Sequence, residues 1–353
     1  MTPKEERKTW IDQSKGLAIM LVVLGHVVTN GMSSGIVSDI GVWSVLNKEI
    51  YSFHMPLFFL LSGYLSCPKN IQIDDWGGIE KQFKKILFLT IPYVIFSVFY
   101  FLAKLFTVSS GAVVNPVHAN DILLIYKMPI GEYWFLYALI LYNVVNLFFL
   151  ICVKVCKRRA LYKLLIIVFT LLSFIVVSEC VDISEFMVKH SGLRRPFLHS
   201  FYFFIGIIVH MYELRMDRIA NNICVAAALV LSVLFLNIIS LKSGLFCCLL
   251  AITMIFLTVK FFKWKDVSFI GEFGKYSLAI YLMHPFFIVL CKIVLSRSVG
   301  VSLYVIIATV LSIALPYSLY VYFIRRVDVL NFVFEPKKYL SNESGTKDKL
   351  PAE

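Results

Sequence analysis

The sequence predicts an all-α protein: a polytopic helical membrane protein of about ten transmembrane helices, with both termini in the cytoplasm. Hydrophobic residues make up 59% of the 353 residues, and charged residues only 16%. A soluble chain has about half apolar and about a quarter charged residues. The apolar residues gather in long runs separated by short charged segments. This pattern is typical of helices that cross a bilayer.

Ten apolar runs are predicted to be the spans, because each is close to the ~20 residues that cross ~30 Å of hydrocarbon. In chain order they are 13–31, 49–66, 84–106, 133–153, 161–178, 197–211, 222–240, 243–261, 268–294 and 300–324. No small-residue cleavage site follows the first run. We therefore expect a retained first helix and not a cleaved signal peptide.

The chain is expected to form one transmembrane domain over residues 1–335. The polar segment 336–353 is predicted to be a disordered cytoplasmic tail, because it has too few apolar residues to pack. We find no internal repeat and no second soluble domain.

The net charge of +12 would suit nucleic-acid binding, but its distribution argues against that partner. The lysines and arginines lie in the connectors between apolar runs, mostly in those assigned to the cytoplasm when the N-terminus is inside. This bias follows the positive-inside rule. The eight cysteines are scattered without a C-x-x-C pair, so we predict no metal site.

The first span carries ionisable residues where they are costly. Asp12 and Lys15 stand at its inner end, and His26 follows Lys15 by eleven residues, about 16 Å along a helix. Eleven residues are close to three turns, so Lys15 and His26 share a helix face. A packed structural histidine with a snorkelling lysine is the alternative.

Three other segments place polar residues in or near spans. His54 lies in the outer half of the second span, Glu132 and Trp134 open the fourth, and His284 lies in the outer half of the ninth. Three of them have a structural alternative: a packed histidine for His284, a solvated end residue for Glu132, and an aromatic belt for Trp134. In the second span, a kinked and tightly packed helix would explain Pro56 and Ser62-Gly63 but not His54.

The three histidines come from different spans, yet the topology places all of them in the outer half of the bilayer. Glu132 opens its span near the same level. Titratable groups that converge in an apolar site are expected of a proton-transfer centre. We therefore predict His26, His54 and His284 to be catalytic, with His26 as general base.

Four motifs resemble the acyltransferase-3 family. They are W-I-D-x-x-K-G-x-A-I-x-x-V-V-x-G-H (10–26), F-H-M-P-L-F-F-x-x-S-G-Y (53–64), Y-W-F-L-Y-A-L (133–139) and G-x-x-S-L-x-I-Y-L-x-H-P (274–285). Within that family the chain is most similar to stand-alone fucose 4-O-acetylase-like and polysaccharide O-acetyltransferases. Many members have arginine where this chain has Lys15, which keeps the charge but loses the bidentate fork.

The resemblance implies a multi-pass enzyme of the bacterial inner (plasma) membrane. It would move an acyl group, expected to be acetyl, from cytoplasmic acetyl-CoA to a glycan or lipid-linked sugar. The donor is a substrate, and no bound cofactor is expected. Besides Lys15 and the three histidines, the candidate substrate-binding residues are Asp12, Glu132, Trp134, Lys84, Lys85, Arg158 and Arg159.

A transporter or flippase for a lipid-linked sugar or small anion is one alternative, since polar groups deep in spans also suit transport. A non-catalytic membrane component of a polysaccharide machine is another, and it would tolerate the loss of all three histidines. The spans are expected to contact membrane lipid. The acceptor sugar, a succinyl or other acyl group and a homo-oligomer are left open by the sequence.

Overall fold

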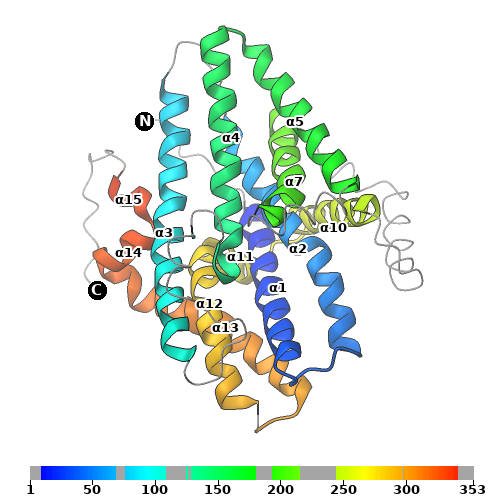
Figure 1. Cartoon of the computed structure of the whole chain (residues 1–353), viewed down its shortest axis with the longest axis vertical. Helices are drawn as coiled ribbons and strands as arrows, with labels where there is room; N and C mark the ends of the chain where they lie inside the picture. Colours follow the sequence, from blue (N-terminus) through cyan, green and yellow to red (C-terminus); the bar gives the residue numbers. More distant parts are fainter. Residues whose placement is uncertain are drawn as a thin grey trace.

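The computed structural model describes residues 9–68, 76–108, 125, 129–179, 193–214, 244–296 and 298–340. Every regular element in these ranges is helical (Figure 1). The helices are α1 (Thr9–Ser33), α2 (Val42–Ser66), α3 (Gly77–Val108), α4 (Trp134–Cys156), α5 (Arg159–Glu179), α7 (Arg194–Met211), α10 (Gly244–Trp264), α11 (Ser268–Lys275), α12 (Ser277–Leu295), α13 (Val301–Tyr322), α14 (Asp328–Phe334) and α15 (Pro336–Leu340). The 3₁₀ turns η2 (Gly131–Tyr133) and η3 (Ile324–Arg326) flank α4 and α13.

The all-helical, polytopic prediction is confirmed. Five candidate membrane spans occur in the described ranges, at Thr9–Ser33, Gly77–Leu105, Gly131–Cys156, Ser277–Leu295 and Val301–Arg326. The predicted span 222–240 lies outside the described residues. The expected tail from residue 336 begins instead with helix α15, and residues 341–353 lie outside the described ranges.

The ninth predicted span is wrong as one continuous helix. Residues 268–294 divide into α11 and α12 at Tyr276, whose φ of −104° and ψ of 18° leave the helical region. Helix α11 packs closely on α1, because a Cβ on Gly274 would collide with the Asp12 carbonyl oxygen, and one on Gly16 with that of Ile270. Uniform hydropathy hides such a break, since the break depends on packing against another helix.

Helix α1 occupies the centre of the bundle and contacts α2, α10, α11, α12 and α13. The α4–α5 turn stands at the top of Figure 1. The link from α1 to α2 and the link from α12 to α13 both lie at the bottom. Segments assigned to the cytoplasm and to the outside therefore stand at opposite ends of the molecule.

Helices α2 and α7 approach each other through glycines. A Cβ on Gly63 would collide with the carbonyl oxygen of Phe203, and one on Gly206 with that of Leu60. Small residues at a helix contact let two backbones approach closely in a membrane protein. This contact fixes α2, the helix that carries His54.

Candidate active site

The three predicted histidines come together with Glu132. His26 Nε2 lies 3.2 Å from a carboxylate oxygen of Glu132. The His26 ring stacks on His284, with ring centroids 5.3 Å apart and an interplanar angle of 26°. The other nitrogen, Nδ1, lies 3.1 Å from the hydroxyl of Tyr51. We call His26, Tyr51, His54, Glu132 and His284 the histidine cluster.

His54 joins the cluster through Tyr51. Its Nδ1–H donates to the carbonyl of Ile50 at 2.5 Å, and its ring meets that of Tyr51 edge to face at 4.9 Å. The side chain of His54 is buried. Its ring therefore supports Tyr51 from the interior of the bundle.

His284 is oriented by the proline that follows it. Pro285 has no N–H, so the helix leaves the carbonyl of Tyr281 without its usual backbone donor. His284 Nδ1–H donates to this carbonyl at 2.7 Å and to that of Ile280 at 3.2 Å. The other nitrogen, Nε2, is buried and has no hydrogen-bond partner in the described part of the chain. Its lone pair is free to accept a hydrogen bond from a ligand.

A second aromatic group lies around Trp134. His199 Nδ1–H donates to the carbonyl of Arg195 at 2.8 Å, and the His199 ring lies 5.3 Å from the rings of Trp134 and Phe59. The Arg195 guanidinium lies 5.4 Å from the Trp134 ring centroid. Trp134 therefore packs on a cation and an imidazole, beyond a simple membrane-interface role.

Sequence reasoning missed Tyr51, His199 and Arg195. His199 opens the run 197–211 at the outer level shared by the other histidines, so the same depth argument would have found it. Tyr51 precedes His54 by three residues, which places both on one helix face. Arg195 could not have been found in this way, because its positive charge alone does not distinguish it from the other basic residues in the connectors.

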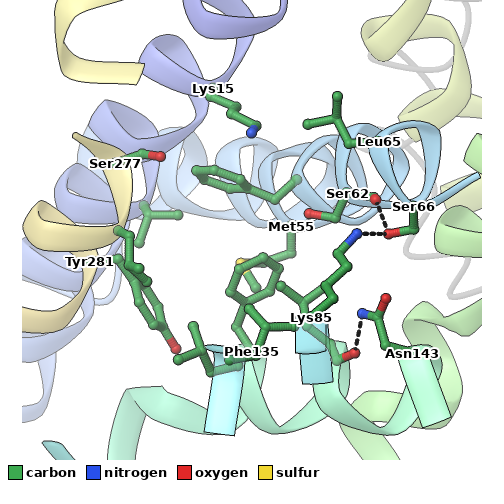
Figure 2. A pocket seen from close by; sticks show the side chains of 16 residues that line it. Lys15, Met55, Ser62, Leu65, Ser66, Lys85, Phe135, Asn143, Ser277 and Tyr281 are labelled. Atoms are coloured by element: carbon green, nitrogen blue, oxygen red, sulfur yellow. Dashed lines mark hydrogen bonds between the residues drawn. The ribbon is translucent and has the colours of Figure 1, made fainter. Parts of the chain in front are cut away.

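A cavity of about 280 Å³ lies between α1, α2, α3, α4 and α12. Figure 2 shows Lys15 and Lys85 among its lining side chains, with a hydrogen bond from the Lys85 ammonium to the Ser66 hydroxyl. Ser62, Asn143 and Ser277 supply further polar groups, and the remaining walls are apolar.

No member of the histidine cluster lines the cavity, but two residues of the cavity wall lie close to the cluster. Tyr281 lines the cavity, and its ring lies 6.0 Å from that of His284. The Tyr281 hydroxyl donates to the carbonyl of Glu132. Val22 lines the same wall one helical turn before His26. Helices α1 and α12 thus each carry residues of both the cavity and the histidine cluster.

The other predicted donor-binding residues lie away from this cavity. Lys84 pairs with Glu80 at 2.6 Å on a partly exposed face. Arg158 and Arg159 are exposed at the α4–α5 turn. Asp12 is buried on α1 and does not line the cavity. No group of three His, Cys, Asp or Glu side chains suitable for a metal ion occurs in the described ranges.

Comparison with known proteins gives a family match over most of the chain. The acyltransferase-3 family model, described as an acyltransferase domain, matches residues 8–321. Nodulation protein NolL of Mesorhizobium japonicum is 30% identical over 128 residues, or 36% of this chain and 32% of that protein. Inner membrane protein YcfT of Escherichia coli is 32% identical over 95 residues, or 24% of this chain and 26% of that protein. The alignments thus span a third or less of these relatives, and no solved structure matches.

Proposed function

The chain belongs to the acyltransferase-3 family, and we propose that it transfers an acetyl group from cytoplasmic acetyl-CoA to a hydroxyl of a cell-surface or lipid-linked glycan. The observation that carries the proposal is the meeting of His26, Glu132 and His284 from three separate elements, next to a cavity that holds two lysines. Independent structural histidines have no reason to meet beside such a cavity.

The cavity suits the acyl-bearing arm of the donor. Pockets for drug-sized ligands measure about 300–1,000 Å³, and this cavity of about 280 Å³ lies at the lower limit. It would accept an acyl-pantetheine arm and leave the nucleotide outside at the cytoplasmic face. Lys15 and Lys85 would attract the diphosphate that joins this arm to the nucleotide, and the apolar walls would surround the acyl group.

The chemical step requires a base. A sugar hydroxyl is a poor nucleophile at neutral pH, and a positioned base that removes its proton contributes about 10²–10⁴-fold to the rate. His26 would be this base, with Glu132 stabilising the imidazolium. The Nε2 of His284, which has no partner among the described residues, would accept a hydrogen bond from a neighbouring hydroxyl of the acceptor sugar and so orient the acceptor.

The acceptor is proposed to enter from the outer side. Tyr51 is 39% exposed and the Glu132 side chain 32%, whereas the His26 side chain is only 14% exposed. The location of the enzyme itself is supported by its helices, which are long and apolar enough to span a membrane, and by a partial relative that is named an inner membrane protein. We accordingly place the enzyme in the bacterial inner membrane.

The proposal is tested with membranes that contain the protein, radiolabelled acetyl-CoA and a panel of surface glycans. We expect covalent label in the glycan with the wild type and its loss in His26→Ala, while the variant still inserts and purifies as a folded protein. Mass spectrometry of the product should show an increase of about 42 Da for each acetyl group transferred.

A transporter or flippase would behave differently in the same experiment. It would move a solute without leaving covalent label, with or without His26. Full acetylation by His26→Ala would remove the assigned base, and no labelling with the wild type would remove the enzymatic proposal for these acceptors.

A further inference from the structure

Both ring nitrogens of His26 are already occupied. Nδ1 faces the Tyr51 hydroxyl at 3.1 Å, and Nε2 faces the Glu132 carboxylate at 3.2 Å. A carboxylate only accepts hydrogen bonds, so Nε2 carries the proton and Nδ1 holds the lone pair. The basic nitrogen of His26 is therefore the one covered by Tyr51.

The hydrogen bonds that reach Tyr51 fix the direction of its own proton. The Asn47 amide donates to the Thr29 hydroxyl at 3.1 Å, and the Thr29 hydroxyl donates to the Tyr51 oxygen at 3.3 Å. With its oxygen accepting from Thr29, the Tyr51 hydroxyl directs its proton to Nδ1 of His26. One hydrogen-bonded chain with a single direction thus runs from Asn47 through Thr29, Tyr51 and His26 to Glu132.

The backbone is built to hold this contact. Gly25 precedes His26 on α1, and a Cβ there would lie 2.9 Å from the Cε2 atom of Tyr51. The absent side chain lets the Tyr51 ring lie against α1. His54 packs against the same ring edge to face, at a centroid distance of 4.9 Å.

We infer that Tyr51 is a catalytic residue that carries the proton between the acceptor hydroxyl and Nδ1 of His26. This inference rests on the proposed acetyl transfer. Tyr51 is the exposed member of the pair, at 39%, and the His26 side chain is 14% exposed. An incoming hydroxyl therefore meets the Tyr51 oxygen before it meets the imidazole.

The step balances without another reactant. The acceptor O–H proton passes to the Tyr51 oxygen while the Tyr51 proton passes to Nδ1 of His26. The acceptor oxygen bonds to the acyl carbon, and the carbon–sulfur bond breaks. The imidazolium then gives up its proton, which reaches the sulfur, so that CoA leaves as the thiol and His26 returns to its starting state.

The test is Tyr51→Phe, which keeps the ring that packs on His54 and removes only the hydroxyl. We expect kcat to fall about 100-fold or more, within the range of a lost proton-transfer group, while the KM for acetyl-CoA stays within about twofold. Tyr304→Phe is the matched control. Its hydroxyl is buried on α13 and has no hydrogen-bond partner in the described ranges, so its loss should leave kcat unchanged.

A second variant separates proton transfer from structure. Site-specific replacement of Tyr51 by 3-fluorotyrosine keeps the hydroxyl and makes it more acidic. If Tyr51 carries the proton to His26, a role that we call the Tyr51 relay, the pH profile of kcat should move toward lower pH. A purely structural role of Tyr51 would leave the profile in place.

The outcomes distinguish this inference from the proposed function. If Tyr51→Phe works at the wild-type rate while His26→Ala is inactive, the relay is overturned and acetyl transfer stands. An unmoved pH profile in the fluorinated protein would also overturn the relay. If the wild type transfers no acetyl group at all, both proposals fail together.

Discussion

At the scale of single residues, position in the bundle decides what each lysine and histidine can do. The carbonyl that Pro285 releases accepts a hydrogen bond from Nδ1 of His284, so that ring is held in place, and its Nε2 has no partner in the described ranges. Lys84 and Lys85 are neighbours in sequence, yet only Lys85 lines the cavity. Adjacent residues on a helix point about 100° apart, so one turns inward and the other toward solvent.

Replacement of Lys85 tests the donor cavity. Lys85→Met keeps the length of the side chain but removes the ammonium that bonds Ser66 and faces the cavity. A hydrogen bond to a charged group contributes about 1.5–3 kcal/mol, which corresponds to roughly a tenfold change or more in an equilibrium constant. We expect the KM for acetyl-CoA to rise about tenfold, measured by initial rates in detergent.

Lys84→Met is the matched control for this experiment. It removes the same charge one residue earlier, from a side chain that pairs with Glu80 outside the cavity. The KM for acetyl-CoA should stay near the wild-type value. Equal effects of the two substitutions would mean that net charge at the inner face, and not the cavity, determines donor affinity.

The sequence predicted that the three histidines of the candidate site lie close together, because burial of an ionisable group in a membrane is costly. That argument found His26, His54 and His284 and placed them at one level. It did not find Tyr51, because a tyrosine near the membrane surface is ordinary. It also did not separate Lys85 from Lys84, because the rotation of α3 depends on contacts with α2 and α4 that hydropathy does not encode.

At the scale of helices, glycines and prolines determine how closely the elements pack and where they break. Gly63 and Gly206 bring α2 and α7 together, and Gly16 and Gly274 bring α1 and α11 together. The sequence predicted the long described helices from their apolar length, but not the short helices α14 and α15. It predicted neither these contacts nor the break at Tyr276, since both depend on a partner helix distant in the chain.

Substitution of Gly206 tests the α2–α7 contact. A Cβ at this position would collide with the Leu60 carbonyl oxygen and lie 2.9 Å from the Tyr64 backbone nitrogen. Backbone atoms cannot rotate away, so the helices must separate, and overpacking of this kind costs about 1–3 kcal/mol. We expect Gly206→Ala to lower the melting temperature, measured by thermal unfolding in detergent.

Gly78→Ala provides the comparison, because a Cβ at Gly78 meets nothing within 4 Å. Alanine is favoured over glycine in a helix by about 1 kcal/mol, so this variant should unfold at or above the wild-type temperature. A similar loss of stability in both variants would indicate a general effect of replacing helical glycine and not the α2–α7 contact.

At the scale of the whole molecule, the two halves of the proposed reaction occupy different depths. On α1, Lys15 lies near the start of the helix, at the end assigned to the cytoplasm, and His26 lies near its other end. That other end continues into the α1–α2 link at the bottom of Figure 1. Acetyl-CoA is confined to the cytoplasm by its charge. An enzyme so arranged would pass the acetyl group across the bilayer without moving CoA itself.

This directional arrangement depends on an orientation that labelling can test. In a cysteine-free background, we would restore Cys156, which is exposed at the end of α4, or introduce Asp39→Cys, which is exposed between α1 and α2. We expect a membrane-impermeant maleimide to label position 39 in intact cells, and Cys156 only after permeabilisation, because positive charge holds the α4–α5 turn inside. Retained acetyl transfer in both variants would confirm that they fold. The reverse labelling would place the lysine-lined cavity outside, where no CoA is available, and cytoplasmic acetyl-CoA would then have no access to the cavity.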